Sequence, residues 1–243
     1  AGTFANNDKI FLSFVASGET GATGGTSTLG IASGNSPVFT SGVADDDFLK
    51  VAGTTVEGRS AAEVASDIGA KTVGKESIWV PAGAMYPNTT AGCSALTQVE
   101  LSNGPELKVL DFATGADDFA QFSVAFPKSW NEGTITYQPF WTVTGTNAGT
   151  VVWQLGGIAV TSDATINTAF GTLVATTALA HSTTSNDLMV SAESGAVTIA
   201  GSPSTDDVCF FQINNDTSAS GQTGAVRLLG IKIFFTTDAA NDA

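Results

Sequence analysis

The chain has 243 residues, which is long enough for one substantial hydrophobic core. Only 13% of the residues are charged and 27 are glycine, a composition that favours all-β structure with many tight turns. Nine basic and 23 acidic residues give a net charge of −14 without a Lys/Arg cluster, which argues against nucleic acid as a partner.

Residues 1–44 are predicted to form an N-terminal attachment arm. An apolar run at residues 10–16 is suitable for one strand, and residues 17–36 are nearly all small, with too little apolar area to order alone. The segment is either a solvated linker or an arm that orders against a partner. The first residues lack the basic start and apolar run of a secretory signal, and no segment reaches the roughly 18 apolar residues of a membrane span. We therefore expect synthesis in a cytoplasm and no membrane insertion.

Residues 45–75 are predicted to be a connector that contains one short helix. Ser60 and Glu63 have the spacing of a capping box, so the helix should start at Ser60, and Gly69 should supply the left-handed residue that ends it. Val64 and Ile68, four residues apart, form a narrow apolar stripe. Because so short a helix is unstable alone in water, we predict that Val64 and Ile68 pack against a neighbouring subunit.

The connector resembles a module of tail-fibre and other virion proteins of tailed bacteriophages, with the pattern FLKV-G-T-VEGR-AEV-SDIG. The resemblance covers about a tenth of the chain. It implies a virion structural protein, a class in which homotrimers are common. The residues that carry it are Phe48, Leu49, Lys50, Val51, Gly53, Val56, Glu57, Gly58, Arg59, Glu63, Val64, Asp67, Ile68 and Gly69.

Residues 76–243 are predicted to form an antiparallel, jelly-roll-like β-sandwich, so the fold class is all-β. Apolar, often alternating runs separated by Gly, Asn, Asp or Pro mark seven strands, and a helical turn is expected within 164–170. Pro139 indicates an edge or a bulge. Two of the strands are apolar on both faces, which suggests cover by the core on one side and by a second subunit on the other. The seven runs are 107–112, 119–126, 134–143, 151–160, 197–199, 208–213 and 226–235.

No residue pattern indicates catalysis, a metal site or a cofactor. His181 is the only histidine and is expected to be an exposed loop residue, whereas zinc sites and Ser-His-Asp triads need more partners. The adjacent aspartates at 45–47, 117–118 and 206–207 lack the alternating spacing of a calcium loop and are expected to cap turns or face solvent. The glycine-rich segment 21–34 lacks a phosphate-binding lysine.

The tryptophans and cysteines give the remaining candidate residues. Trp141 and Trp153 lie in strand patterns and are expected in the core or at a subunit interface, whereas Trp130 lies at a turn and is the candidate surface-contact residue. Cys209 is expected to be a buried free thiol, and the pairing of Cys93 is open.

Together these features predict a non-enzymatic structural component of a tailed-phage particle. A short fibre or spike would attach through its N-terminal region to other virion proteins, associate with itself as a homotrimer, and display the sandwich to a host surface glycan. The first alternative is a capsid decoration protein. The second is a carbohydrate-binding or glycan-degrading module.

Overall fold

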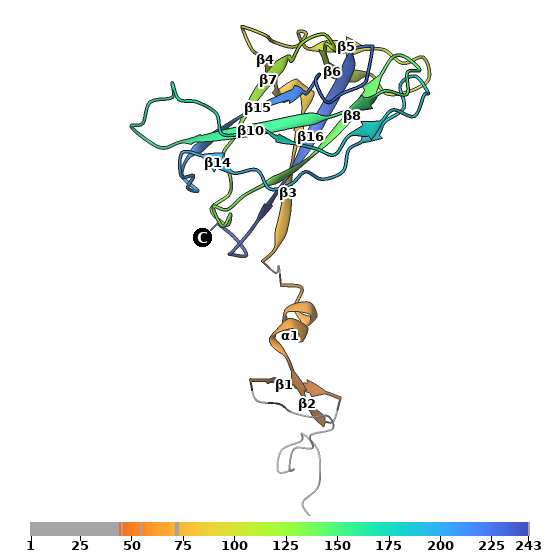
Figure 1. Ribbon diagram of the computed structural model, residues 1–243. Helices are drawn as coiled ribbons and strands as arrows, with labels where there is room; N and C mark the ends of the chain where they lie inside the picture. The colour runs from red at the N-terminus through yellow and green to blue at the C-terminus, as the bar shows by residue number, and fades with distance from the viewer. Residues whose placement is uncertain (1–43, 45, 54, 71–72, 243) are drawn as a thin grey trace, which may run out of the picture. The chain divides into compact units, whose positions relative to one another are not determined.

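The computed structural model describes residues 44, 46–53, 55–70 and 73–242, which fall into two compact units. Figure 1 shows both units as a ribbon. Apart from Ala44, the predicted N-terminal arm lies outside the described residues. No helix in the described ranges has the length and apolarity that a membrane crossing needs.

The first unit is a β-hairpin followed by one helix. Strands β1 (Phe48–Ala52) and β2 (Thr55–Arg59) pair antiparallel, and α1 (Ala61–Asp67) follows directly. The predicted capping box is present: the Ser60 hydroxyl accepts from the Glu63 amide, and the Glu63 carboxylate accepts from the Ser60 amide. Gly69 has a φ of 63°, so the helix ends in the left-handed conformation that the sequence predicts.

The helix buries none of its residues within its unit. Phe48, Leu49 and Ile68 are exposed by 56%, 59% and 72%, and with Val64 they line one shallow hollow. Ion pairs between Lys50 and Asp67 (2.8 Å) and between Arg59 and Asp67 (3.5 Å) hold the helix to the hairpin. In the described part of this unit, caps and ion pairs therefore organise the helix, and Phe48, Leu49, Val51 and Ile68 remain exposed.

The second unit is an antiparallel β-sandwich, which confirms the predicted fold class. Its β10 sheet has the order β11-β10-β15-β7-β4, and the short β14 pairs parallel to β10. Its β8 sheet has the order β13-β8-β16-β6-β5, with β3 alongside β16. The chain passes repeatedly from one sheet to the other, and Figure 1 shows β10 and β15 in one layer and β8 and β16 in the other.

The observed bounds match the predicted ones closely for the long strands and less closely for the short ones. The β8 sheet contains β3 (Lys75–Pro81), β5 (Thr97–Val99), β6 (Leu107–Phe112), β8 (Thr136–Val143), β13 (Met189–Val190) and β16 (Val226–Thr236). The β10 sheet contains β4 (Tyr86–Pro87), β7 (Phe119–Val124), β10 (Trp153–Val160), β11 (Val174–Ala175), β14 (Ile199–Ala200) and β15 (Val208–Asn215). Outside these sheets, β9 (Thr150–Val151) pairs with β12 (Leu179–Ala180), and η1 (Ala82–Ala84) is a 3-10 turn.

The core lies between the two sheets and is rich in aromatic side chains. Trp141 and Trp153 are fully buried, as predicted, and the Phe112 ring meets Trp153 edge to face with centroids 5.1 Å apart. The Tyr137 hydroxyl lies 2.8 Å from the carbonyl oxygens of Trp153 and Val174, so it links β8 to the opposite sheet. Burial of an aromatic or large aliphatic side chain contributes about 1.5–3 kcal/mol.

The sequence predicts two local features of the sandwich. The expected helical turn at 164–170 is wrong, because those residues form bends and irregular backbone that follow β10. Pro139 pairs with Ile231 on β16, and its carbonyl accepts from Ser191 just beyond the two-residue β13. β8 lies between β13 and β16 and is therefore not an edge strand, but β16 has a register shift between Leu228 and Gly230, next to Phe140, as the bulge alternative predicts.

Candidate functional site

Trp130, the predicted contact residue, is buried and only 1% exposed, so the prediction that it is exposed is wrong. The C-terminal segment covers its turn: Thr237 forms a bridge with Trp130, and Asp242 accepts from the Ser129 amide at 3.1 Å. The centroids of the Phe126 and Trp130 rings are 4.3 Å apart. Trp130 therefore anchors the turn from inside.

His181 is also buried, at 3% exposure, which contradicts the expected exposed loop histidine. Its Nδ1 lies 3.1 Å from the Asn147 carbonyl oxygen, and its ring is 6.3 Å from that of Trp141. Within the described ranges, no three His, Cys, Asp or Glu side chains are grouped closely enough to hold a metal ion. His181 therefore packs at the edge of the core.

The acidic pairs and the cysteines have structural positions. Asp117 and Asp207 accept hydrogen bonds from the backbone amides of Thr217 and Ser204, as expected for turn-capping residues. Cys93 and Cys209 are both free and buried, which confirms the prediction for Cys209. Burial raises the pKa of each thiol to about 12, so neither is a ready nucleophile.

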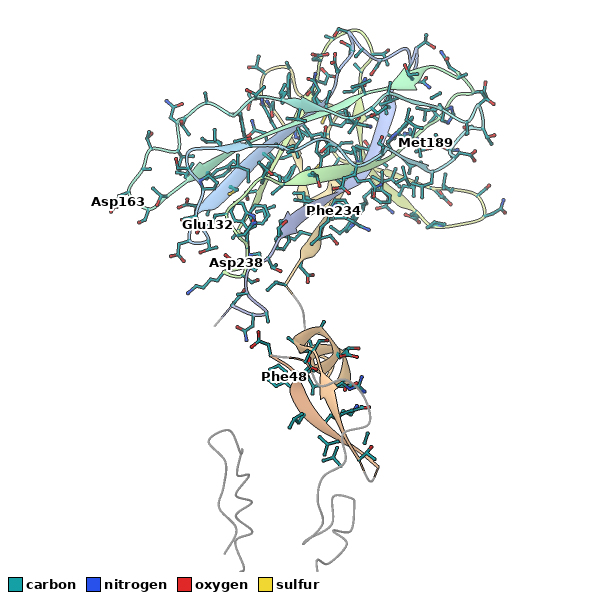
Figure 2. All side chains as sticks on the ribbon, turned by 60° about the horizontal axis from the view of Figure 1, so that its bottom comes forward. Phe48, Glu132, Asp163, Met189, Phe234 and Asp238 are labelled. Atoms are coloured by element: carbon teal, nitrogen blue, oxygen red, sulfur yellow. The ribbon has the colours of Figure 1, made fainter. Side chains whose placement is uncertain are left out.

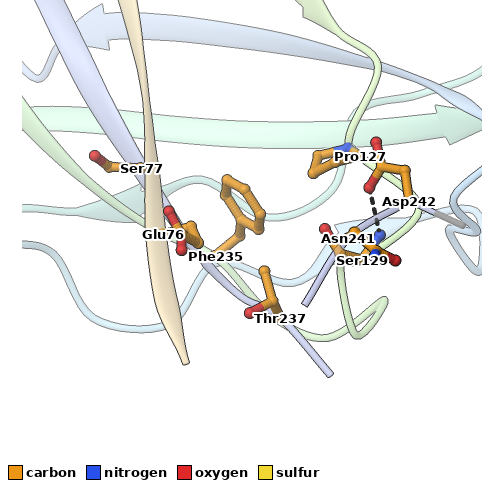
Figure 3. A pocket seen from close by; sticks show the side chains of 8 residues that line it. All are labelled: Glu76, Ser77, Pro127, Ser129, Phe235, Thr237, Asn241 and Asp242. Atoms are coloured by element: carbon orange, nitrogen blue, oxygen red, sulfur yellow. Dashed lines mark hydrogen bonds between the residues drawn. The ribbon is translucent and has the colours of Figure 1, made fainter. Parts of the chain in front are cut away.

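A polar pocket lies beside the C-terminal segment, and Figure 3 shows the eight side chains that line it, among them Glu76, Phe235 and Asp242. The Asp242 carboxylate is used by the Ser129 amide, and Ser77 points away from Phe235 in this view. The Asp242 carboxylate of this pocket is therefore already engaged by a backbone amide.

The outward face of the β8 sheet carries the largest accessible aromatic group of the sandwich. Trp79 on β3 is 47% exposed, and its ring meets the Phe140 ring of β8 edge to face, with centroids 5.1 Å apart. β16 lies between β3 and β8, and it makes this contact possible because its residue below the Trp79 ring is Gly230. A Cβ at Gly230 would lie 2.7 Å from the Trp79 ring, so only glycine lets the indole lie across β16.

Lys232 lies beside this aromatic pair. It is the register partner of Trp79 on β3 and of Gln138 on β8. Its ammonium nitrogen is 5.8 Å from the centre of the Phe140 ring and 5.9 Å from that of Phe234, within the range of cation–π attraction. Figure 2 labels Phe234 on β16 and Met189 on β13 of the same sheet.

A polar bridge closes one end of the same face. The Glu193 carboxylate accepts from Lys75 on β3 and from Thr136 on β8, and the Lys75 ammonium lies 4.5 Å from the centre of the Phe234 ring. The bond from Lys75, followed by that from Thr136, holds the pKa of Glu193 below its usual value. Phe234 therefore lies below an ion pair, while Trp79 stays open.

These residues define a candidate site, which we call the aromatic face: Trp79, Phe140, Lys232, Phe234, Gln138 and Val190. Val190, 40% exposed, pairs with Phe140 and extends the apolar row onto β13. The aromatic face combines flat apolar rings with one ammonium and one amide group. This arrangement can bind a molecule that has both apolar C–H surfaces and many hydroxyl groups.

Sequence reasoning missed this site, although a signal was available. In β3 the residues Ser77 and Trp79 alternate with Ile78 and Val80, and Val80 is buried. Side chains of a strand point alternately to its two faces, so if Ile78 and Val80 face the core, Trp79 must face outward. The neighbours Phe140 and Lys232 come from other strands and could not be paired with it from sequence.

Comparisons with known proteins give only remote structural similarity. No protein-family model matches the chain, and no curated protein matches it significantly. Among solved structures, the chain is similar to a xylan-binding domain of carbohydrate-binding module family 22 (11% identity, 65% of this chain and 89% of that one, TM-score 0.37). It is also similar to a family 11 carbohydrate-binding module from Clostridium thermocellum (10% identity, 67% and 96%, TM-score 0.36). With TM-scores this low, neither ligand nor activity extends from these proteins to this chain.

Proposed function

We propose that the sandwich is a carbohydrate-binding domain and that its binding site is the aromatic face. The single observation that supports this most directly is Trp79, an indole that is 47% exposed and fixed in place by Phe140 and Gly230. A pyranose ring offers an apolar C–H face that packs on an aromatic ring, and its hydroxyls need donors and acceptors at the edge of that ring. The Lys232 ammonium lies beside the Phe140 ring that Trp79 contacts, and Gln138, whose amide nitrogen donates to the Ser191 carbonyl at 3.0 Å, is its register partner on β8.

The geometry favours a binding role over catalysis for this face. The Glu193 carboxylate, at one end of this face, accepts from Lys75 and Thr136, and these bonds displace its titration away from neutral pH. A carboxyl group that acts as a general acid near neutral pH needs a raised pKa, whereas the pKa of Glu193 is lowered. The aromatic face therefore holds a ligand without supplying a proton to it.

The test is binding of the full chain to an array of glycans, followed by titration with the best ligand for wild type, Trp79→Ala and Tyr86→Ala. Trp79→Ala should weaken binding about tenfold or more, as expected for a central aromatic contact. Tyr86, 50% exposed on β4 of the other sheet, is the matched control and should have no effect. Absence of any glycan ligand, or equal loss in both variants, overturns the proposal. So does a fall in oligomeric mass for Trp79→Ala, which would make the face a subunit contact.

A second proposal concerns the setting in which the domain works. The connector resembles phage virion modules, and its exposed Phe48, Leu49 and Ile68 leave an apolar surface for assembly. We propose that the chain is displayed on a phage particle as a fibre or spike, with a shell decoration protein as the alternative. Gold-labelled antibody on purified particles tests this: label on projections supports the fibre, label over the head supports decoration, and particles without label overturn both.

A further inference from the structure

We infer that the aromatic face selects anionic glycans, meaning chains that carry carboxylate or sulfate groups, and that Lys232 is the residue that selects them. This inference rests on the proposed carbohydrate-binding function and adds the class of ligand. Its basis is the distribution of charge over the outward face of the β8 sheet.

Two ion pairs on the β8 sheet neutralise four of its charged groups. Lys75 bonds Glu193, and Arg227 bonds Asp111 with a nitrogen–oxygen distance of 3.1 Å. Lys232 has no carboxylate partner among the described residues, although the chain has 23 acidic residues for nine basic ones. Lys232 therefore places an unneutralised positive charge beside the aromatic rings.

The position of Lys232 suits a charged sugar substituent. Its ammonium and the Trp79 indole border the same Phe140 ring, at 5.8 Å and 5.1 Å from the ring centre. A pyranose stacked on Trp79 can thus direct a carboxylate or sulfate to Lys232 within the length of a disaccharide. Both aromatic rings lie within cation–π range of the ammonium, and a carboxylate or sulfate that reaches it would form a charge-assisted hydrogen bond.

The overall charge of −14 opposes a polyanion only at a distance. The Debye length is about 8 Å at physiological ionic strength, so distant carboxylates are screened while a direct contact with Lys232 persists. This leads to a measurable signature. Binding of an anionic glycan should not collapse when salt is raised from low to physiological concentration, because screening removes long-range repulsion together with part of the attraction.

The experiment compares paired ligands that differ only in charge: polygalacturonate with its fully methyl-esterified form, and ι-carrageenan with its desulfated form. Wild type should bind the charged member of at least one pair about tenfold more tightly. Lys232→Gln should remove that preference and Lys232→Arg should keep it. Lys108→Gln, the same charge change at an exposed position on β6, is the control and should behave like wild type. Thermal unfolding of each variant verifies that the fold is intact.

The outcomes separate the two proposals. If charged and uncharged members bind equally, or if Lys108→Gln has the same effect as Lys232→Gln, the inference about anionic glycans is overturned while carbohydrate binding stands. If no member of either pair and no other glycan binds, both fail. A preference for the carboxylated or for the sulfated pair identifies which anion Lys232 recognises.

Discussion

At the scale of single residues, two tryptophans show how exposure depends on what covers a position. Trp79 is 47% exposed and Trp130 is 1% exposed, although Trp130 lies in a turn and Trp79 in a strand. The cover over Trp130 comes from Thr237 and from the bond between Ser129 and Asp242, more than 100 residues along the chain. Local sequence contains no sign of a contact over that distance, so the turn alone suggested the wrong residue.

Because Trp130 is buried and Trp79 is half exposed, replacing each by alanine should lower the free energy of unfolding by different amounts. Trp130→Ala should lower the free energy of unfolding by about 3–5 kcal/mol, because it leaves a cavity against Phe126 and below the C-terminal segment. Trp79→Ala should cost less than about 1 kcal/mol, because half of the side chain is already in water. Denaturant titration of both variants measures the difference. Equal costs would contradict the assignment of one residue to the core and the other to the surface.

At the scale of elements, the sequence predicts the local units well and their pairing poorly. Ser60, Glu63 and Gly69 specify the helix within a few residues, since caps act through neighbouring backbone groups. The long strands follow their apolar alternation. Which strands become neighbours is decided by packing, and the contact of Trp79 with Phe140 across Gly230 depends on a register shift in β16 between Leu228 and Gly230.

The bridge across β3, β16 and β8 predicts a pH dependence. The folded-state pKa of Glu193 is lowered by Lys75 and Thr136, so its contribution to stability is present above its unfolded pKa and is lost as the pH falls through the folded value. Because the pair is largely exposed, we expect about 0.5 kcal/mol. Glu193→Gln should be less stable than wild type at pH 6, and the difference should shrink as the pH is lowered below about 4.

Urea unfolding at a series of pH values measures this difference. Glu100→Gln is the control, an exposed carboxylate without an ion pair in the described part of the chain, and it should differ little from wild type at any pH. If the difference between Glu193→Gln and wild type stays constant down to the acid limit, the carboxylate charge does not stabilise the bridge.

At the scale of the whole molecule, the connector is the part that needs a partner. Its helix buries no residue, and Ile68 is 72% exposed, so the described residues of this unit supply no internal core to stabilise a helix of seven residues. The prediction that Val64 and Ile68 pack against a neighbouring subunit is consistent with this exposure and stays a prediction.

We expect the purified chain to have a mass three times that of the 24.6 kDa subunit, and Val64→Glu with Ile68→Glu to reduce it, because each substitution would bury a charge at the contact. Light scattering measures the mass. Ile166→Glu, at a position of the sandwich exposed by 69%, is the matched control and should leave the assembly unchanged. A wild-type mass of one subunit, or equal masses for all variants, would contradict the prediction.

By itself, the sequence determined the β-rich fold, the capped helix, the buried Trp141 and Trp153, and the buried thiol of Cys209. Each of these follows from short-range periodicity, composition or backbone capping. The tertiary structure decided which aromatic groups remain accessible, since that depends on strand register, on the space above Gly230 and on the segment that covers Trp130. Exposure is a property of contacts between distant parts of the chain, and local patterns do not encode those contacts.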